Sequence, residues 1–263
     1  MKRTLIAVVS AALVPLVGAT SATVANNTGT RTDGSQVAVV QQLRVQVLEK
    51  RPHDSTAFTE GFELSHGVLY EGTSTDLRAT DPRTGQVVKR ADVGSDLFGE
   101  GLTVVGDTIW ELNWTDKAVS WDRTTLTRTG EAAMTGWGWG LCYDGTRLIR
   151  SDGSGQLFFH DPKTFAELGT VRVTVAGVPV HMVNEMECAH GTVWANIWKS
   201  DRIVRIDPRD GRVTAVVDAS GLYQGTDPED VLNGIASIPG TDEFLITGKH
   251  WPTTFRVKFV PVH

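Results

Sequence analysis

The side chains of this sequence that could do chemistry lie in short segments that recur along the chain. They comprise acids, amides, a lysine and aromatic rings, namely Phe58, Glu60, Glu100, Trp137, Trp139, Asn184, Glu185, Glu187 and Asn233, with Trp114, Trp198 and Lys249 following one strand later. Carboxylates can exchange protons with a substrate, amides and a lysine can stabilise negative charge, and indoles can exclude water. The set predicts a pocket for a cationic or amide-bearing group, in which proton transfer and positioning supply the catalysis.

Several other kinds of site lack their sequence motifs. Neither a Cys-x-x-Cys nor a His-x-x-x-His pair is present to bind zinc. Lys249 is not preceded by the glycine spacing of a phosphate-binding loop, and residues 136–140 lack the spacing of a dinucleotide-binding turn. Ser154 lies outside the Gly-x-Ser-x-Gly context of a hydrolase nucleophile. We therefore expect no metal ion and no organic cofactor.

A repeated turn motif indicates which elements position these residues. An aspartate follows a β-rich run and begins a turn at Asp81, Asp122, Asp161 and Asp207, at intervals of about 40 to 45 residues. Three of these turns contain proline or glycine, which favour turn conformations. Units of this length with several short strands are typical of β-propeller blades, whose inner strands surround one channel. The residues that open each unit should therefore converge in space.

We expect an all-β fold, a five-bladed β-propeller that forms the catalytic domain over residues 41–263. The last unit, residues 232–259, lacks a final strand, while the strand at residues 43–48 has no unit of its own. Pairing the two would hide the open edge strands of the ring. We therefore expect the N-terminal strand to close the last blade.

The first residues have the pattern of a targeting segment. Lys2 and Arg3 precede an apolar run and a zone of small residues, as in a secretory signal peptide. We expect a signal peptide over residues 1–25, a flexible leader over residues 26–40, and a secreted or cell-envelope (extracytoplasmic) protein. The apolar run is shorter than the ~20 residues of a membrane span, so we expect no membrane span after signal cleavage. An oxidising compartment permits a disulfide between Cys142 and Cys188.

Composition narrows the function classes further. With 25 lysines and arginines against 31 acidic residues the formal charge is −6, and without a basic run the chain is not expected to bind nucleic acid. Eight tryptophans outnumber three tyrosines. We expect Trp110, Trp121 and Trp194, at repeating strand positions, to pack in the core, and the other indoles to lie at or beside the pocket.

Eight motifs in this chain resemble those of the glutamine cyclotransferase family, the plant and bacterial type of glutaminyl cyclase. The most specific are Asn184-Glu185-Met186-Glu187, Val193-Trp194-Ala195-Asn196-Ile197-Trp198, Val231-Leu232-Asn233-Gly234-Ile235-Ala236 and Thr247-Gly248-Lys249-His250-Trp251-Pro252. The others include Ala57-Phe58-Thr59-Glu60-Gly61-Phe62, Phe98-Gly99-Glu100-Gly101-Leu102-Thr103, Leu112-Asn113-Trp114 and Gly138-Trp139-Gly140-Leu141. They occur in the same order as in the family and span nearly all of residues 41–259.

The resemblance implies a five-bladed propeller that converts the N-terminal glutamine of peptides or proteins to pyroglutamate and releases ammonia, without a metal. Glu100 then resembles the family's general acid/base, and Asn184 and Lys249 can donate to the amide oxygen of the substrate. The implied substrate-binding residues are Phe58, Glu60, Trp114, Trp139 and Trp198. The implied partner is a peptide or protein with N-terminal glutamine, and we expect a monomer.

Two departures from the family concern the rim of the pocket. Trp137 stands where the family usually has a glutamate, and the loop after Glu71 is shorter than in the family. Two other functions stay open at this point: a non-catalytic propeller that binds a sugar or peptide through its tryptophans, and a lactonase-like hydrolase that holds calcium with acids and amides. The first predicts no ammonia release, and the second predicts loss of activity with a chelator.

Overall fold

The computed structural model describes residues 39–262. They belong to one compact unit, Val37–His263, and form 22 strands and no helix. The predicted signal peptide (residues 1–25) and nearly all of the predicted leader (residues 26–40) lie outside the described residues. Within the described part of the chain, no helix is long and apolar enough to cross a membrane. The all-β class predicted from the sequence is confirmed.

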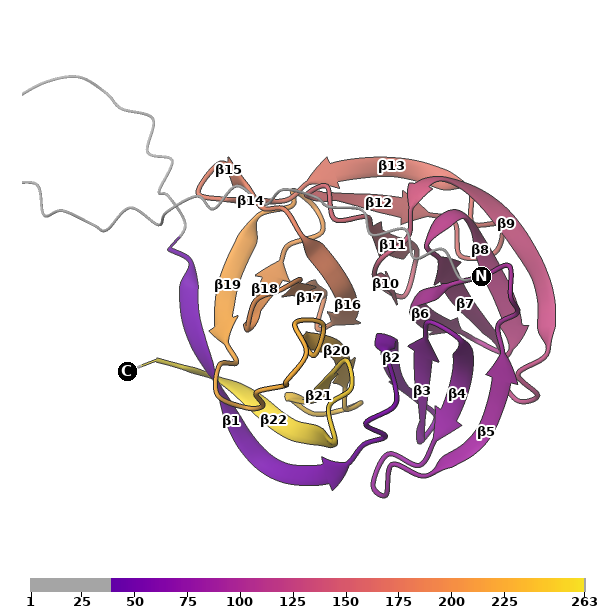
Figure 1. Ribbon diagram of the computed structural model, residues 1–263. Coiled ribbons are helices and arrows are strands. Elements are labelled where there is room, and N and C mark those ends of the chain that lie inside the picture. The colour runs from indigo at the N-terminus through magenta and orange to yellow at the C-terminus, as the bar shows by residue number, and fades with distance from the viewer. Residues whose placement is uncertain (1–38, 263) are drawn as a thin grey trace, which may run out of the picture. The chain divides into compact units, whose positions relative to one another are not determined.

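Three four-stranded antiparallel sheets follow one another along the chain (Figure 1). The first contains β2 (Thr59–Ser65), β3 (Val68–Thr73), β4 (Asp76–Thr80) and β5 (Val87–Asp92). The second contains β6 (Gly99–Val105), β7 (Thr108–Asn113), β8 (Thr115–Asp122) and β9 (Arg128–Trp137). The third contains β10 (Leu141–Tyr143), β11 (Leu148–Ser151), β12 (Gln156–His160) and β13 (Glu167–Arg172), and is followed by the hairpin of β14 (Thr174–Val175) and β15 (Val178–Pro179).

The remaining strands form one eight-stranded sheet in the order β16-β17-β18-β19-β1-β22-β21-β20. Their bounds are β1 (Gln41–Pro52), β16 (Val183–Ala189), β17 (Thr192–Ile197), β18 (Arg202–Ile206), β19 (Val213–Asp218), β20 (Leu232–Ser237), β21 (Glu243–Gly248) and β22 (Thr253–Pro261). The predicted pairing of the N-terminal strand with the last unit is present, since β1 pairs antiparallel with β22. The sequence did not indicate that β1 also pairs parallel with β19. β1 therefore completes a four-stranded group with β20–β22 and joins it to the group β16–β19, so that it covers an edge of each.

The strands β2, β6, β10, β16 and β20 lie toward the centre of the fold (Figure 1). Each of them contacts the next, and β20 contacts β2. The Gly101 N–H in β6 donates to the Trp139 carbonyl beside β10 (2.8 Å). Asn233 in β20 donates to the Thr59 carbonyl in β2 (2.9 Å), which connects the last group to the first. We call these five the inner strands. The arrangement is propeller-like, and it gathers the beginnings of strands that are far apart in the sequence.

Glycine is required where the inner strands approach most closely. A Cβ on Gly140 would lie 2.1 Å from the carbonyl oxygen of Asn184, and a Cβ on Gly101 would lie 2.6 Å from that of Trp139. Backbone atoms cannot yield to such a contact as a flexible side chain can. The pairing of glycine with an apolar residue at the start of a unit therefore reflects the close packing of neighbouring inner strands.

The aspartate turns have the hydrogen bonds expected from their sequence. The Asp122 carboxylate accepts two backbone N–H groups (3.0 and 2.7 Å), and the turns at Asp81 and Asp161 repeat this pattern. Four residues after the aspartate, Leu126 and Phe165 have φ angles of 55° and 62°. Both side chains are buried. Packing therefore offsets the cost of a conformation that glycine adopts more easily.

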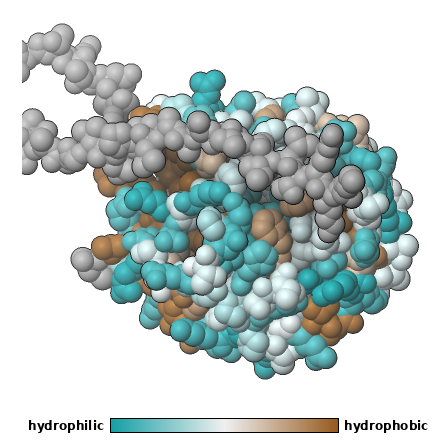
Figure 2. Space-filling view, in the orientation of Figure 1, coloured by the Kyte–Doolittle hydropathy of each residue, from teal (hydrophilic) through white to brown (hydrophobic). Residues whose placement is uncertain are grey.

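Hydrophobic clusters fill the spaces between neighbouring sheets. Trp110 packs against Phe165 of the next sheet (ring centroids 5.2 Å apart), and Trp121 and Trp194 are buried in two other clusters. The prediction that these three tryptophans belong to the core is confirmed. One face of the molecule carries mostly hydrophilic residues with separate hydrophobic patches (Figure 2). The core therefore lies between the sheets, and it holds the inner strands in place.

Candidate active site

A buried ion pair lies where β2 begins and β21 ends. Lys249 places Nζ 2.6 Å from Glu60 Oε1, and the Asn233 amide donates to the other Glu60 oxygen (3.2 Å). Lys249 Nζ also lies 4.2 Å from the centre of the Phe58 ring. Burial raises the pKa of Glu60 and outweighs the opposing effect of the lysine charge. The structure thus brings the predicted residues Phe58, Glu60 and Lys249 into direct contact.

Glu100 is a second buried carboxyl group beside this pair. It lies at the start of β6, the inner strand next to β2, and its side chain is almost fully buried. Burial and the nearby charge of Glu60 raise the pKa of Glu100 well above its usual range, against the effect of Lys249. Within residues 39–262 the Glu100 carboxyl group has no hydrogen-bond partner that would favour either its charged or its neutral form. A carboxyl group in this environment can both accept and donate a proton.

Three buried asparagines add unpaired polar groups. Asn184 is the second residue of β16, where its carbonyl accepts a hydrogen bond from the Ser151 hydroxyl (2.9 Å). No hydrogen bond among the described residues involves the side-chain amide of Asn184, a residue that is 4% exposed. Asn233 Oδ1 and Asn196 Nδ2 are likewise buried without a partner in the described part of the chain. Such groups are costly unless a ligand or water pairs with them, so they indicate a binding site.

The predicted tryptophans divide between a half-buried pair and an exposed residue on the rim. Trp139 and Trp198 pack edge to face, with ring centroids 5.4 Å apart, and the Trp198 Nε1 is buried with no partner among the described residues. Trp114, in contrast, is exposed and connects to Phe58 only through the Phe98 ring. The structure therefore places Trp139, just before β10, and Trp198, just after β17, in segments close to Asn184, but puts Trp114 on the rim.

Sequence reasoning missed a histidine that lies behind this cluster. His53 Nε2 lies 2.8 Å from Glu71 Oε1, and His53 Nδ1 lies 2.5 Å from the Trp251 carbonyl oxygen. Thr59 also donates to the same Glu71 oxygen (2.7 Å). Because both ring nitrogens face acceptors, the ring is best satisfied when it is protonated. Burial lowers the pKa of His53, but the hydrogen bond and charge of Glu71 outweigh this and raise it.

His53 connects the segment that carries Lys249 to Glu71 in β3, which also accepts a hydrogen bond from Thr59 at the start of β2. Its two partners lie 18 and 198 residues away in the sequence. Neither spacing is a motif, and no pattern near His53 pointed to it. Only the ring of inner strands brings the three segments together.

Three further acids lie along the inner strands. Glu63 accepts from the Thr103 hydroxyl (2.6 Å), Glu187 from the Ser237 N–H (3.1 Å), and Glu185 from a backbone N–H of β20 (2.8 Å). Burial raises the pKa of Glu63 to about 7, and that of Glu187, beside Glu63, to about 8. Their oxygens bridge neighbouring inner strands. We therefore assign Glu185 and Glu187, which the sequence grouped with the pocket, to the packing of the channel.

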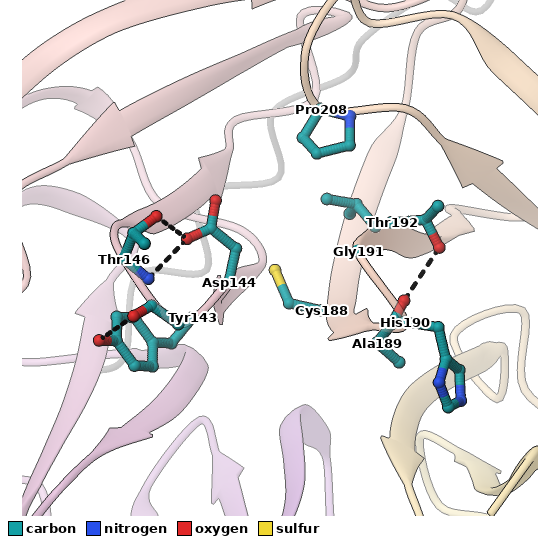
Figure 3. A pocket seen from close by; sticks show the side chains of 11 residues that line it. Tyr143, Asp144, Thr146, Cys188, Ala189, His190, Gly191, Thr192 and Pro208 are labelled. Carbon is teal, nitrogen blue, oxygen red and sulfur yellow. Dashed lines mark hydrogen bonds between the residues drawn. The ribbon is translucent and has the colours of Figure 1, made fainter.

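A separate cavity of about 410 Å³ lies beside the disulfide that joins Cys142 in β10 to Cys188 in β16 (Figure 3). It is lined by residues of the turns that follow these strands, such as Asp144 and His190. The predicted site residues are at the other ends of the inner strands, and none of them lines this cavity. Among the described residues, no three His, Cys, Asp or Glu side chains are grouped to hold a metal ion.

The fold and this cluster define a propeller-like, all-β protein with a buried site of acids, a lysine and indoles. The family profile described as glutamine cyclotransferase matches residues 16–259. The glutaminyl-peptide cyclotransferase of Arabidopsis thaliana is 33% identical over 246 residues, which cover 88% of this chain and 77% of that protein. The crystal structure of Myxococcus xanthus glutaminyl cyclase has a TM-score of 0.82 and 38% identity, over 86% of this chain and 100% of that one. The chain belongs to the glutamine cyclotransferase family, so the family and enzyme class predicted from the sequence are confirmed.

Proposed function

We propose that this protein converts the N-terminal glutamine of peptides and proteins to pyroglutamate and releases ammonia. The observation that carries the proposal is the buried Glu100 carboxyl group beside the Glu60–Lys249 pair. In the reaction, the α-amino nitrogen attacks the side-chain amide carbon of the same residue. A carbon–nitrogen bond closes the five-membered ring, the bond to the amide nitrogen breaks, and ammonia leaves.

Glu100 moves the proton that this reaction must transfer. The attacking amine loses a proton, and the leaving nitrogen gains one. An α-amino group has a pKa of ~7.7–8.0. The raised pKa of Glu100 makes its carboxylate a stronger base than an ordinary one, and so better suited to accept the proton of that amine. The same carboxyl group then returns the proton to the departing nitrogen. One residue placed between the two nitrogens can therefore serve both steps.

Lys249 and Asn184 stabilise the negative charge that develops on the amide oxygen. An ammonium group has three N–H donors, and the pair with Glu60 uses one of them. The buried Asn184 amide supplies a further donor. Fixed donors in a site without water stabilise such charge more than water does. Glu60, which Asn233 also holds, keeps the lysine in place and faces the amino group of the substrate.

The aromatic residues hold the substrate in a folded conformation. Trp139 and Trp198 form a half-buried pair, and Phe58 packs against Lys249. A glutamine side chain bent between these rings has its amine close to its own amide carbon, which lowers the entropy lost in the reaction. Trp114 lies further out and contacts the part of the substrate at the rim.

We also propose that the fold has five blades, formed by β2–β5, β6–β9, β10–β13, β16–β19 and β20–β22 completed by β1. The contacts between successive inner strands, including the return from Asn233 to Thr59, support this count. We further propose that the protein is a monomer, that it is secreted or retained at the cell envelope, and that residues 1–25 are its signal peptide. Its catalytic domain spans residues 41–263.

The proposed mechanism needs no metal, and one assay tests it. Purified protein is incubated with a Gln-initiated peptide and with the same peptide carrying N-terminal glutamate, each with and without a chelator. We expect one ammonia to be lost per Gln-initiated peptide, with an equal rate in chelator, and none from the control peptide. No ammonia from either would support a non-catalytic binding protein. Loss of activity in chelator would support the calcium-dependent alternative.

A further inference from the structure

The exposed aromatic side chains of residues 39–262 are gathered in one place. Among phenylalanine, tyrosine and tryptophan, only Phe98, Trp114 and Trp137 are exposed in this part of the chain, at 38%, 44% and 46%. They come from three separate segments: the loop before β6, the turn after β7 and the end of β9. Large exposed apolar groups that cluster together mark binding surfaces more often than chance exposure does.

These rings form a continuous row that begins at the proposed site. The row starts at Phe58, which contacts Lys249, and continues through Phe98, Trp114 and Trp137 with centroid separations of 6.3, 6.3 and 6.1 Å. Each ring is tilted or perpendicular to the next. We call Phe98, Trp114 and Trp137 the aromatic ridge.

Backbone hydrogen bonds hold the ridge in position. The Phe98 N–H donates to the Asn113 side chain (2.8 Å), and the Trp114 N–H donates to the Phe98 carbonyl (3.1 Å). The buried Arg150 guanidinium donates to the Trp137 carbonyl. A surface that is ordered before binding loses little entropy when a ligand arrives. The ridge therefore has the rigidity of a binding surface.

We propose that the aromatic ridge binds the residues that follow the N-terminal glutamine and favours apolar or aromatic side chains there. This inference rests on the proposed function, because a buried glutamine pocket forces the rest of the peptide to leave across the rim. The ridge is the apolar part of the rim that is continuous with Phe58. A hollow of about 390 Å³ beside Phe98, lined by Ser74, Thr75 and Ser95 among others, offers polar groups to the peptide backbone.

The test compares two substrates that differ only after the glutamine, Gln-Phe-Phe-amide and Gln-Gly-Gly-amide. We expect the wild type to have the larger kcat/KM for the phenylalanine peptide. Phe98→Ala and Trp137→Ala should each lower the ratio of the two kcat/KM values by about fivefold to tenfold, mainly through KM. Trp137→Phe should keep most of the preference. Leu168→Ala, which changes a 61% exposed leucine on β13, is the control and should leave the ratio unchanged.

Other results would overturn the inference or its basis. An equal ratio in the wild type and both alanine variants would show that the ridge does not bind the peptide. A wild type that sediments as a dimer, with a monomeric Trp137→Ala variant and an unchanged ratio, would identify a second copy of the chain as the occupant. If the wild type releases no ammonia from either peptide, the proposed function itself fails, and this outcome is distinct from a lost preference.

Discussion

Lys249 Nζ lies 2.6 Å from the carboxylate of Glu60, a residue 189 positions away, and both side chains are almost completely buried. Each charge is tolerable because the other is present. Removal of one partner from a buried pair leaves an uncompensated charge, which typically costs about 3–5 kcal/mol, whereas removal of both can cost much less. The pair thus fixes Lys249 and makes the candidate site depend on two distant segments.

Lys249→Met should lower the free energy of unfolding by about 3–5 kcal/mol, and adding Glu60→Gln should restore a large part of it. Urea denaturation of the two single variants and the double variant gives the coupling energy. Lys199→Met is a matched control, because Lys199 forms a pair of similar length with Glu229 (2.7 Å) on the exposed surface. It should cost less than about 1 kcal/mol. Additive effects at Lys249 and Glu60 would contradict the predicted coupling.

Glu100→Gln should lower kcat/KM for a Gln-initiated peptide by about 10²–10⁴-fold, because amide cannot transfer the proton. The free energy of unfolding should not fall in this variant. Burial raises the pKa of Glu100, so the wild-type charge destabilises the fold above the usual carboxyl pKa, and a neutral amide removes that cost. Activity assays and urea denaturation at neutral pH check both expectations. Near-normal turnover by this variant would remove Glu100 from the acid/base role.

Glu111 should make the protein less stable as the pH rises. Burial, with the nearby charge of Asp76, raises the pKa of Glu111 to about 8, and Glu111 Oε1 has no hydrogen-bond partner among the described residues. A raised carboxyl pKa contributes stability that is present below the unfolded value of about 4.3 and is lost as pH rises through the folded value. Glu111→Gln should therefore have a larger unfolding free energy than the wild type at pH 9, whereas the two should differ much less at pH 5. The gain at pH 9 should be several kcal/mol (about 1.4 per pKa unit).

The comparison for Glu111 uses Glu131→Gln, since Glu131 is an exposed acid on β9. This control should follow the wild-type pH dependence. If Glu111→Gln follows it as well, then the buried carboxyl group does not titrate in the predicted range.

His53 should add a second pH dependence, with the same sign. Its pKa is raised by Glu71, so the stability it contributes is present below the unfolded histidine value of about 6.5 and is lost as pH rises through the folded value. His53→Gln should show a smaller fall in unfolding free energy between pH 6 and pH 9 than the wild type does. His66→Gln, which changes an exposed histidine, serves as the control. Identical pH curves for the wild type and His53→Gln would rule out the charged His53–Glu71 pair.

Much of the fold was predictable because its signals are local. Each aspartate turn is built from a carboxylate and backbone N–H groups two and three residues away, as at Asp122. The spacing of these turns, the alternating strands and the unpaired strand at the N-terminus therefore indicated repeated β units and the pairing of β1 with β22. The same local motifs carried the family resemblance and pointed to Glu100 and Lys249.

The relationships within the site could not be predicted, because they join segments that meet only when the inner strands surround a centre. The pairing of Glu60 with Lys249 and the position of His53 between Glu71 and Trp251 are of this kind. Exposure is also a property of the whole fold. The sequence motifs assigned both Trp114 and Trp139 to the pocket, yet in the structure Trp114 is exposed on the rim and Trp139 is half-buried. Residue types and spacing encode local turns and strands, while burial, charge pairing and pKa depend on neighbours that long-range contacts supply.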